Sequence, residues 1–409
     1  MRGVTSVLLE ILRARLWVVP GVAAVLATVA ALVVLFVDPA APAGDGLFYV
    51  DADSARAVLS AIAGAMITFT ALVFSITMLV LQQAAAQLSP RVMRTFLRDR
   101  FSQAVLGLFV AAFVFALLVL LDIERDAASR LGVLVAVGLV LAAVLVFVAY
   151  IDHMAHAIRP TSVIRSIGAE TRDAIERNYP ADDTDERTRE SGRDTESGRD
   201  TLDAQDHATL AWSGESGYIQ LVDEEELLEI ARRAGRDLSL LQGVGSYLVR
   251  GSPVLALSDG PDEPDAAEED IRGVVHVGSE RTMSQDPEFG FRQLTDVALR
   301  ALSPSLNDPT TAVQVIDELH ALLRHLRDRP IPAPRTISRD GAPVVRVPAP
   351  GWDDFVRSAV DDIAQAGRQH PSIAHRLNLM LRDLERDCSA DRLPALRRAL
   401  ERIDEGAGS

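Results

Sequence analysis

Four long apolar runs, separated by polar segments, open the chain. They cover roughly residues 17–37, 57–81, 103–121 and 131–151. Each is close to the ~20 residues that a helix needs to cross a ~30 Å hydrocarbon core. The first run exceeds the about 7–15 apolar residues of a secretion signal, so we expect it to be retained. The pattern predicts a four-span transmembrane domain over residues 1–160.

Arginines are concentrated in alternate connections between the predicted spans. They precede the first span, lie between the second and third, and follow the fourth, whereas the other two connections are dominated by acidic residues. Because positively charged loops stay in the cytoplasm, we expect both termini to be cytoplasmic in a bacterial inner membrane. The residues that set this orientation are Arg2, Arg13, Arg15, Arg91, Arg94, Arg98, Arg100, Arg159, Arg165 and Arg172.

The second run carries small and polar side chains at a regular spacing. Two interleaved seven-residue repeats would form one stripe on a helix, made of Gly64, Thr68, Ala71, Ser75, Met78 and Gln82. Thr70 and Thr77 would lie on the opposite face. One interpretation is a water-filled path in a homo-oligomer. The other is helix packing, in which Ser and Thr bond their own preceding carbonyls and small residues allow close approach.

A short helix is predicted over residues 90–100, after Ser89 as its N-cap. Arg91, Arg94 and Arg98 would follow one side of it, at the level of the lipid headgroups. They would contact anionic lipid or, in a homo-oligomer, form a cationic ring at the mouth of a pore. The four runs hold no ionisable residue in mid-span, which argues against a pump or ion-coupled carrier.

His153 and His156 follow the fourth run, one helical turn apart. They could share a metal ion, with Asp152 nearby in a membrane enzyme, or they could be neutral interfacial histidines. We expect no metal and no cofactor. The chain also lacks the sequence signatures of a nucleophile elbow, a zinc protease, a phosphate-binding loop or a dinucleotide fold. We therefore expect that it is not an enzyme.

The remainder of the chain is polar and acidic, with thirty Arg against forty-seven Asp and Glu after residue 160. This balance argues against nucleic acid as a partner. The single Cys388 excludes an intramolecular disulfide. We expect a helical connector at 161–179, a disordered acidic linker at 180–206, a β-rich subdomain at 207–280, and a mostly helical subdomain at 281–409 with a hairpin at 336–347.

The predicted fold is therefore an α-helical membrane region of four spans, followed by a cytoplasmic α+β domain with a C-terminal helical bundle. In the second half of the chain, polar and charged residues are most concentrated around two predicted helices. One is expected to begin near Phe291, and the other is capped by Asp308. The candidate residues are Arg281, Asp286, Glu288, Arg292, Asp296, Asn307, Asp308, Thr310 and Thr311. They could form a pocket for an anion such as phosphate, or an ion-pair network that joins the helices to the sheet.

Several segments resemble a bacterial family of predicted membrane proteins, catalogued as domain of unknown function twenty-two fifty-four. The similar segments are residues 63–78, 87–91, 94–99, 156–161, 285–290 and 301–312. The resemblance covers nearly the whole chain outside 180–206. It implies a four-span membrane region with a soluble tail, and it assigns no activity, cofactor or catalytic residue.

Two functional hypotheses follow from these patterns. The first is a homo-oligomeric channel or pore-like protein whose cytoplasmic domain acts as a sensor. The alternative is a membrane-anchored scaffold or signalling module that binds a protein or a small anion through that domain. Under both, the lipid bilayer is a partner.

Overall fold

The computed structural model describes residues 17–38, 41–42, 52–87, 100–123, 127–157, 159–181, 208–258, 271–338 and 343–407. The predicted helix at 90–100 with its three arginines lies mostly outside these residues, as do most of the predicted linker and the turn of the hairpin. The chain divides into two compact units, Met1–Val163 and Ile164–Ser409. Each is described separately below.

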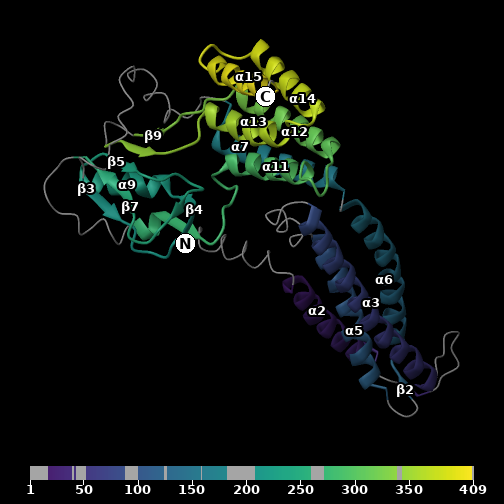
Figure 1. The fold of residues 1–409 in the computed structure, drawn as a ribbon. Coiled ribbons are helices and arrows are strands. Elements are labelled where there is room, and N and C mark those ends of the chain that lie inside the picture. Colours follow the sequence, from purple (N-terminus) through teal and green to yellow (C-terminus); the bar gives the residue numbers. More distant parts are fainter. Residues whose placement is uncertain are drawn as a thin grey trace. The chain divides into compact units, whose positions relative to one another are not determined.

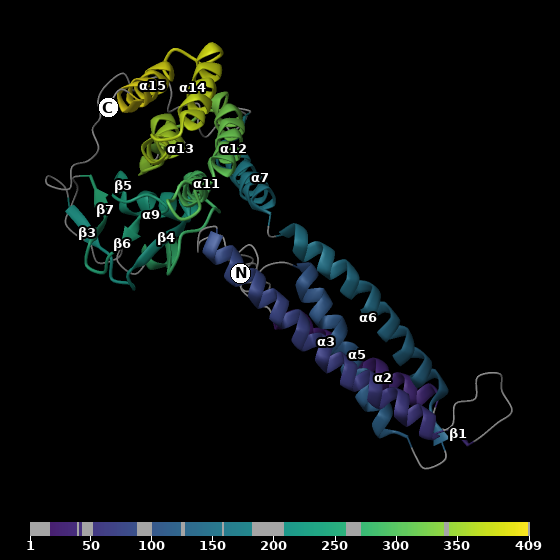
Figure 2. The ribbon, with the colours of Figure 1, turned by 45° about the vertical axis from the view of Figure 1, so that its right-hand side comes forward.

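The first unit is a bundle of long apolar helices that run side by side (Figures 1 and 2). They are α2 (Val18–Val37), α3 (Ala52–Gln87), α5 (Arg100–Leu121) and α6 (Arg130–Ala157). Among the described residues, these four helices are long and apolar enough to cross a membrane, which confirms the predicted spans. Helix α3 is longer than its apolar run and extends it at both ends.

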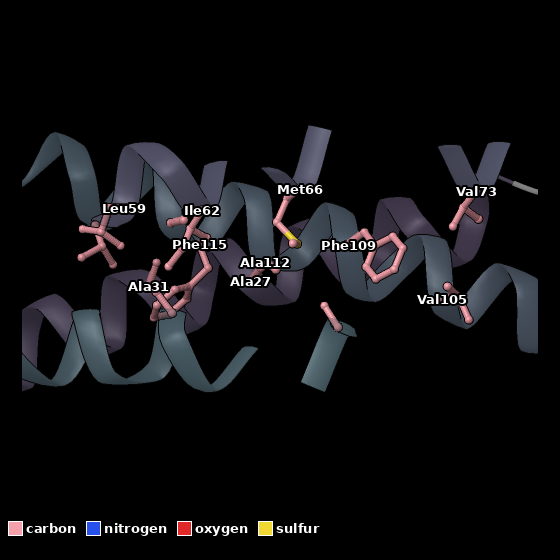
Figure 3. Packing of buried hydrophobic residues seen from close by; sticks show 14 of the residues in the cluster. Ala27, Ala31, Leu59, Ile62, Met66, Val73, Val105, Phe109, Ala112 and Phe115 are labelled. Atoms are coloured by element: carbon pink, nitrogen blue, oxygen red, sulfur yellow. The ribbon is translucent and has the colours of Figure 1, made fainter. Parts of the chain in front are cut away.

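Helix α5 packs against α2, α3 and α6, so its side chains form much of the buried core. Figure 3 shows Phe109, Ala112 and Phe115 of this helix packed among side chains of its neighbours. Gly107 lies so close to Ala23 of α2 that an added Cβ would be 3.3 Å from the Ala23 methyl group. Small residues thus let these helices approach closely, as expected for helices in lipid.

The connections after α2 and after α5 meet at one end of the bundle. There β1 (Ala41–Pro42) pairs antiparallel with β2 (Ala127–Ala128). The carboxylate of Asp38 accepts a hydrogen bond from the backbone N–H of Leu131 at 2.7 Å, at the start of α6. The end of α2 and the start of α6 therefore lie on the same side of the bundle, as an up-and-down arrangement of four spans requires.

The second unit combines two small sheets with a group of helices (Figure 1). Its strands are β3 (Ala208–Ala211), β4 (Gly217–Val222), β5 (Leu238–Leu240), β6 (Tyr247–Leu248), β7 (Pro253–Leu257), β8 (Val275–Gly278), β9 (Arg335–Ile337) and β10 (Val345–Val347). One sheet has the order β3-β7-β5-β10-β9 and the other the order β6-β4-β8. Helix α9 (Glu224–Ala234) contributes Leu227 and Ile230 to the core that these strands share.

Strands β9 and β10, which lie in the region of the predicted hairpin, pair with each other and belong to the larger sheet. Strand β10 pairs antiparallel with β9 and parallel with β5, which lies about a hundred residues earlier in the chain. Two ion pairs support this attachment: Arg335 with Glu224 at 2.6 Å and Arg346 with Asp237 at 3.8 Å.

The helices of the second unit are α7 (Pro160–Asn178), α11 (Pro287–Ala301), α12 (Pro309–Arg327), α13 (Trp352–Ala366), α14 (Pro371–Arg386) and α15 (Leu393–Ala407). The predicted connector, α7, is a core helix, because Ile167, Thr171 and Ile175 are buried. Thr171 lies directly against Gly290 of α11, and Gly168 lies against Glu318 of α12. The α+β region followed by C-terminal helices confirms the predicted fold class.

Candidate functional site

The predicted stripe of small and polar residues on α3 is exposed in the bundle. All six positions are accessible: Gly64, Thr68, Ala71, Ser75, Met78 and Gln82. The opposite side of the helix buries Leu59, Met66, Val73 and other apolar residues against the bundle. The Thr68 hydroxyl donates to the carbonyl of Gly64 at 3.1 Å, as the packing interpretation anticipates. The stripe is therefore an outer surface of this chain.

The second pair of threonines on α3 turns toward the bundle. Thr70 donates to the carbonyl of Met66 at 2.7 Å and Thr77 to that of Val73 at 2.8 Å. The Thr77 hydroxyl also lies 2.6 Å from the hydroxyl of buried Tyr150 on α6. These hydroxyls are satisfied within the chain, so this face of α3 is a packing surface.

A groove runs between α3 and α5 beside the exposed stripe. Its volume is about 510 Å³, and almost all of its accessible surface is apolar. Ala71 belongs to both the groove and the stripe. The remaining lining residues are Ile67, Thr70, Phe74, Leu106, Val110 and Phe113. The stripe therefore borders an apolar groove on the surface of the bundle.

His153 and His156, near the end of α6, make different contacts. The His153 ring packs against Phe101 with 4.8 Å between ring centres. His156 Nδ1 lies 2.8 Å from the backbone carbonyl of Asp152, one turn earlier. Nowhere in the described part of the chain do three His, Cys, Asp or Glu side chains gather as metal ligands would.

In the second unit, Arg281, Asp286 and Glu288 form a compact group at the start of α11. Nε and Nη2 of Arg281 lie 2.9 and 2.7 Å from Oδ2 of Asp286. Oδ1 of Asp286 accepts the backbone N–H of Phe289 at 3.2 Å and so caps the helix. Oε2 of Glu288 is 3.6 Å from Arg281. Burial raises the pKa of Asp286 to about 6, although the charge of Arg281 opposes this shift.

The other candidate residues lie away from the Arg281 group, and most of them have their own partners. Arg292 pairs with Asp362 of α13 at 2.6 Å and with Asp296 at 3.6 Å. Asp308 caps α12 by accepting the N–H and hydroxyl of Thr311, at 3.1 and 2.6 Å. Asn307 and Thr310 are exposed beside it, and Asn307 has a left-handed backbone with φ of 47°.

These contacts favour the ion-pair network over a single anion pocket. Helix α11 has 15 residues and is about 22 Å long, so it separates the Arg281 group from Asn307, Asp308, Thr310 and Thr311. The amino end of α12 already holds the carboxylate of Asp308, and the two arginines face carboxylates of the same chain. The structure therefore does not bring the nine candidate residues together.

The family model for "Predicted membrane protein (DUF2254)" matches residues 13–383. The chain belongs to this family. An uncharacterised protein of Mycobacterium tuberculosis is 30% identical over 393 residues, which cover 93% of this chain and 74% of that protein. An uncharacterised protein of Mycobacterium bovis matches to the same extent. No solved structure matches this chain significantly.

The roles of several residues that complete these arrangements are not predictable from the sequence pattern. Tyr150 was counted as part of an apolar run, although a hydroxyl deep in such a run needs a partner. Gly245, with φ of 88°, lies against Arg281 and Asp286, and only its position in a glycine-rich turn hinted at this role. Ser358, which donates to Glu288 at 2.6 Å, had no signal in the sequence.

Proposed function

We propose that this protein is a homo-oligomeric, pore-like protein of a bacterial inner membrane, with residues 164–409 as a cytoplasmic sensing domain. The observation that carries the proposal is the exposure of the whole stripe on α3, from Gly64 to Gln82. A membrane helix that presents polar side chains away from its own bundle needs protein or water on that side.

Lipid alone is a poor environment for this stripe. Thr68 satisfies its hydroxyl within the helix, but the Gln82 amide has two donors and an acceptor carbonyl to satisfy. Hydrogen bonds between membrane helices contribute only about 0.6 kcal/mol each on average, so several must act together. A second copy of the chain supplies the same groups in the same register.

The spacing of the stripe suits contact between helices. Its members are separated alternately by four and three residues, which is the period of helices that cross at a shallow left-handed angle. Several copies of α3 around an axis would place Thr68, Ser75 and Gln82 in successive neutral, polar rings. Such a passage would suit small polar solutes or hydrated ions, without a fixed charge to select among them.

The orientation rests on the arginine distribution. Positively charged residues occupy the amino-terminal segment, the connection between α3 and α5, and the start of α7. By the positive-inside rule, the second unit would lie in the cytoplasm. Its acidic character also suits a soluble domain rather than one that adheres to anionic lipid headgroups.

The test combines flux with cross-linking. Purified protein in liposomes should conduct small ions, and Ser75→Leu should reduce the flux at least about tenfold by narrowing a polar ring. Ala142→Leu is the matched control, because Ala142 is a small, exposed, mid-span residue of α6. In a Cys388→Ser background, Ser75→Cys should form disulfide-linked dimers and Ala142→Cys should not.

The two readouts separate the alternatives. Cross-linking without flux would favour a membrane-anchored scaffold that assembles through the stripe. Flux that is unaffected by Ser75→Leu would show that the passage lies elsewhere. A tight bilayer with no cross-linking would refute both the assembly and the pore.

A further inference from the structure

Residues 280–288 connect three parts of the second unit, and we refer to them as the strap. The Gln285 side chain bonds both backbone groups of Val222 in β4, its oxygen accepting at 2.8 Å and its nitrogen donating at 3.0 Å. Asn178, at the end of α7, donates to the carbonyl of Ser284 at 3.0 Å. The strap then enters α11, where Glu288 accepts the hydroxyl of Ser358 from α13.

Asp286 lies at the centre of this junction. Its side chain is 2% exposed, and Gly245 approaches it so closely that any side chain there would overlap its Oδ2. Its carboxylate accepts a hydrogen bond from Arg281 within the strap and another from the backbone N–H of Phe289 in α11. Arg281 in turn lies over the Phe289 ring, 5.2 Å from its centre. Movement of the strap therefore requires Asp286 to leave its buried position.

The charges around Asp286 do not balance. Two carboxylates, Asp286 and Glu288, share the single guanidinium of Arg281, which is itself largely buried. Directly after α7 the neighbouring group is Tyr179, and burial raises its pKa to about 12, so it stays neutral. Arg335 of β9 interacts with the Tyr179 side chain and is paired with Glu224. Loop residue Gly245 brings no charge, so the junction carries one excess negative charge.

We propose that Asp286, Arg281 and Glu288 form a proton-binding site, and that uptake of one proton by Asp286 tightens the strap against β4 and α7. A proton removes the excess charge from the more buried carboxylate and leaves Arg281 to pair with Glu288, whose other oxygen is held by Ser358. The neutral acid keeps an oxygen that can accept from Phe289. This inference does not depend on whether the spans form a passage.

The direction of the pH effect follows from the linkage between proton binding and closure of the junction. The pKa of Asp286 is raised to about 6 in the buried position, against an ordinary 3.8 when it is exposed. The closed junction therefore binds more protons than the open one between these values, and acidification favours closure. From pH 7.5 to pH 5.0 the ratio of closed to open junction should rise about tenfold.

Hydrogen–deuterium exchange of the full chain in nanodiscs tests this, with labelling times scaled for the pH dependence of intrinsic exchange. Strap peptides should gain about tenfold protection at pH 5.0 relative to pH 7.5. Asp286→Asn should show the high protection at both pH values. Asp308→Asn is the matched control, because Asp308 is also followed by proline and caps a helix, but its carboxylate is held by Thr311.

The control variant should keep the pH response of the wild-type strap. Equal protection of the wild-type strap at both pH values would overturn the proposal, and this result needs no variant to fold. A pH response that survives in folded Asp286→Asn would also overturn it, because another group would then bind the proton.

Discussion

The hydroxyl oxygens of Thr77 and Tyr150 lie 2.6 Å apart within the membrane bundle and join α3 to α6. Tyr150 is fully buried, and its hydroxyl is also 3.3 Å from the carbonyl of Val73. Thr77 donates to that same carbonyl. Because a hydrocarbon core supplies no water to replace these bonds, the Tyr150 hydroxyl depends on the contact between the two helices.

Tyr150→Phe should therefore lower the free energy of unfolding by about 0.6 kcal/mol, the average contribution of a hydrogen bond between membrane helices. Unfolding of the full chain in mixed detergent micelles measures this. A double-mutant cycle with Thr77→Val should show coupling. The same cycle with Thr70→Val should be additive, because the Thr70 hydroxyl donates to the carbonyl of Met66 rather than to Tyr150. Equal coupling in both cycles would contradict the assigned contact.

The contact between Gly290 and Thr171 fixes α7 against α11. A Cβ at Gly290 would overlap the Thr171 side chain, which is buried and donates to the carbonyl of Ile167 at 2.6 Å. Gly290→Ala should destabilise the second unit by about 1–3 kcal/mol, because the two helices must separate. Thermal unfolding of the purified full chain measures the effect.

Two variants check this explanation. Gly273→Ala is the control, because an added Cβ there meets nothing within 4 Å, and it should be nearly neutral. Adding Thr171→Ala to Gly290→Ala should recover part of the lost stability by removing the overlapping hydroxyl and methyl groups. If Gly290→Ala behaves like Gly273→Ala, the packing of α7 is looser than described.

The spans were predictable because length and apolarity are local properties of a run of residues. The Asp308 cap was predicted for the same reason, since an aspartate before a proline starts a helix. The same signature occurs at Asp286 and Pro287. Helix α11 therefore begins at Pro287, four residues before the predicted start near Phe291.

Long-range partners were not predictable from one sequence. Arg292 meets Asp362, 70 residues away, and nothing in the local pattern distinguishes this aspartate from Asp296. The hairpin was recognised from its turn, but its attachment to β5 depends on a parallel pairing across the whole unit. Likewise, the amphipathic pattern of α7 shows that one face is buried but not which helices cover it.

His320 gives the helical part of the second unit a pH dependence. Arg376 Nη2 lies 3.1 Å from His320 Nδ1, so Nδ1 accepts, and Nε2 donates to Asp383 at 2.9 Å. Burial and Arg376 lower the pKa of His320, although the bond to Asp383 opposes this. The fold therefore prefers the neutral ring, and this preference adds stability above the ordinary pKa of 6.5.

As the pH falls below 6.5, the unfolded chain takes up this proton before the folded one, so the contribution of His320 is lost. His320→Gln should unfold at a temperature that changes less between pH 7.5 and pH 5.5 than that of the wild type. His375→Gln, at an exposed position on α14, should keep the wild-type dependence. An unchanged dependence in His320→Gln would show that the ring does not titrate differently on unfolding.

The last prediction concerns the cap that Asp38 provides to α6. Its Oδ2 accepts the N–H of Leu131 at 2.7 Å and the hydroxyl of Ser129 at 3.2 Å, across 93 and 91 residues. Asp38→Ala should cost about 1 kcal/mol of stability, as for other lost N-caps, and Asp38→Asn should cost less because it keeps an acceptor oxygen.

Asp53→Ala is the control, since that exposed carboxylate pairs with neighbouring Arg56 on its own helix and should matter little. Detergent unfolding of the full chain compares the three variants. Because Asp38 follows α2 and Leu131 belongs to α6, a selective loss in Asp38→Ala requires the two helix ends to share one side of the membrane. Equal losses at Asp38 and Asp53 would remove that support for the order of the spans.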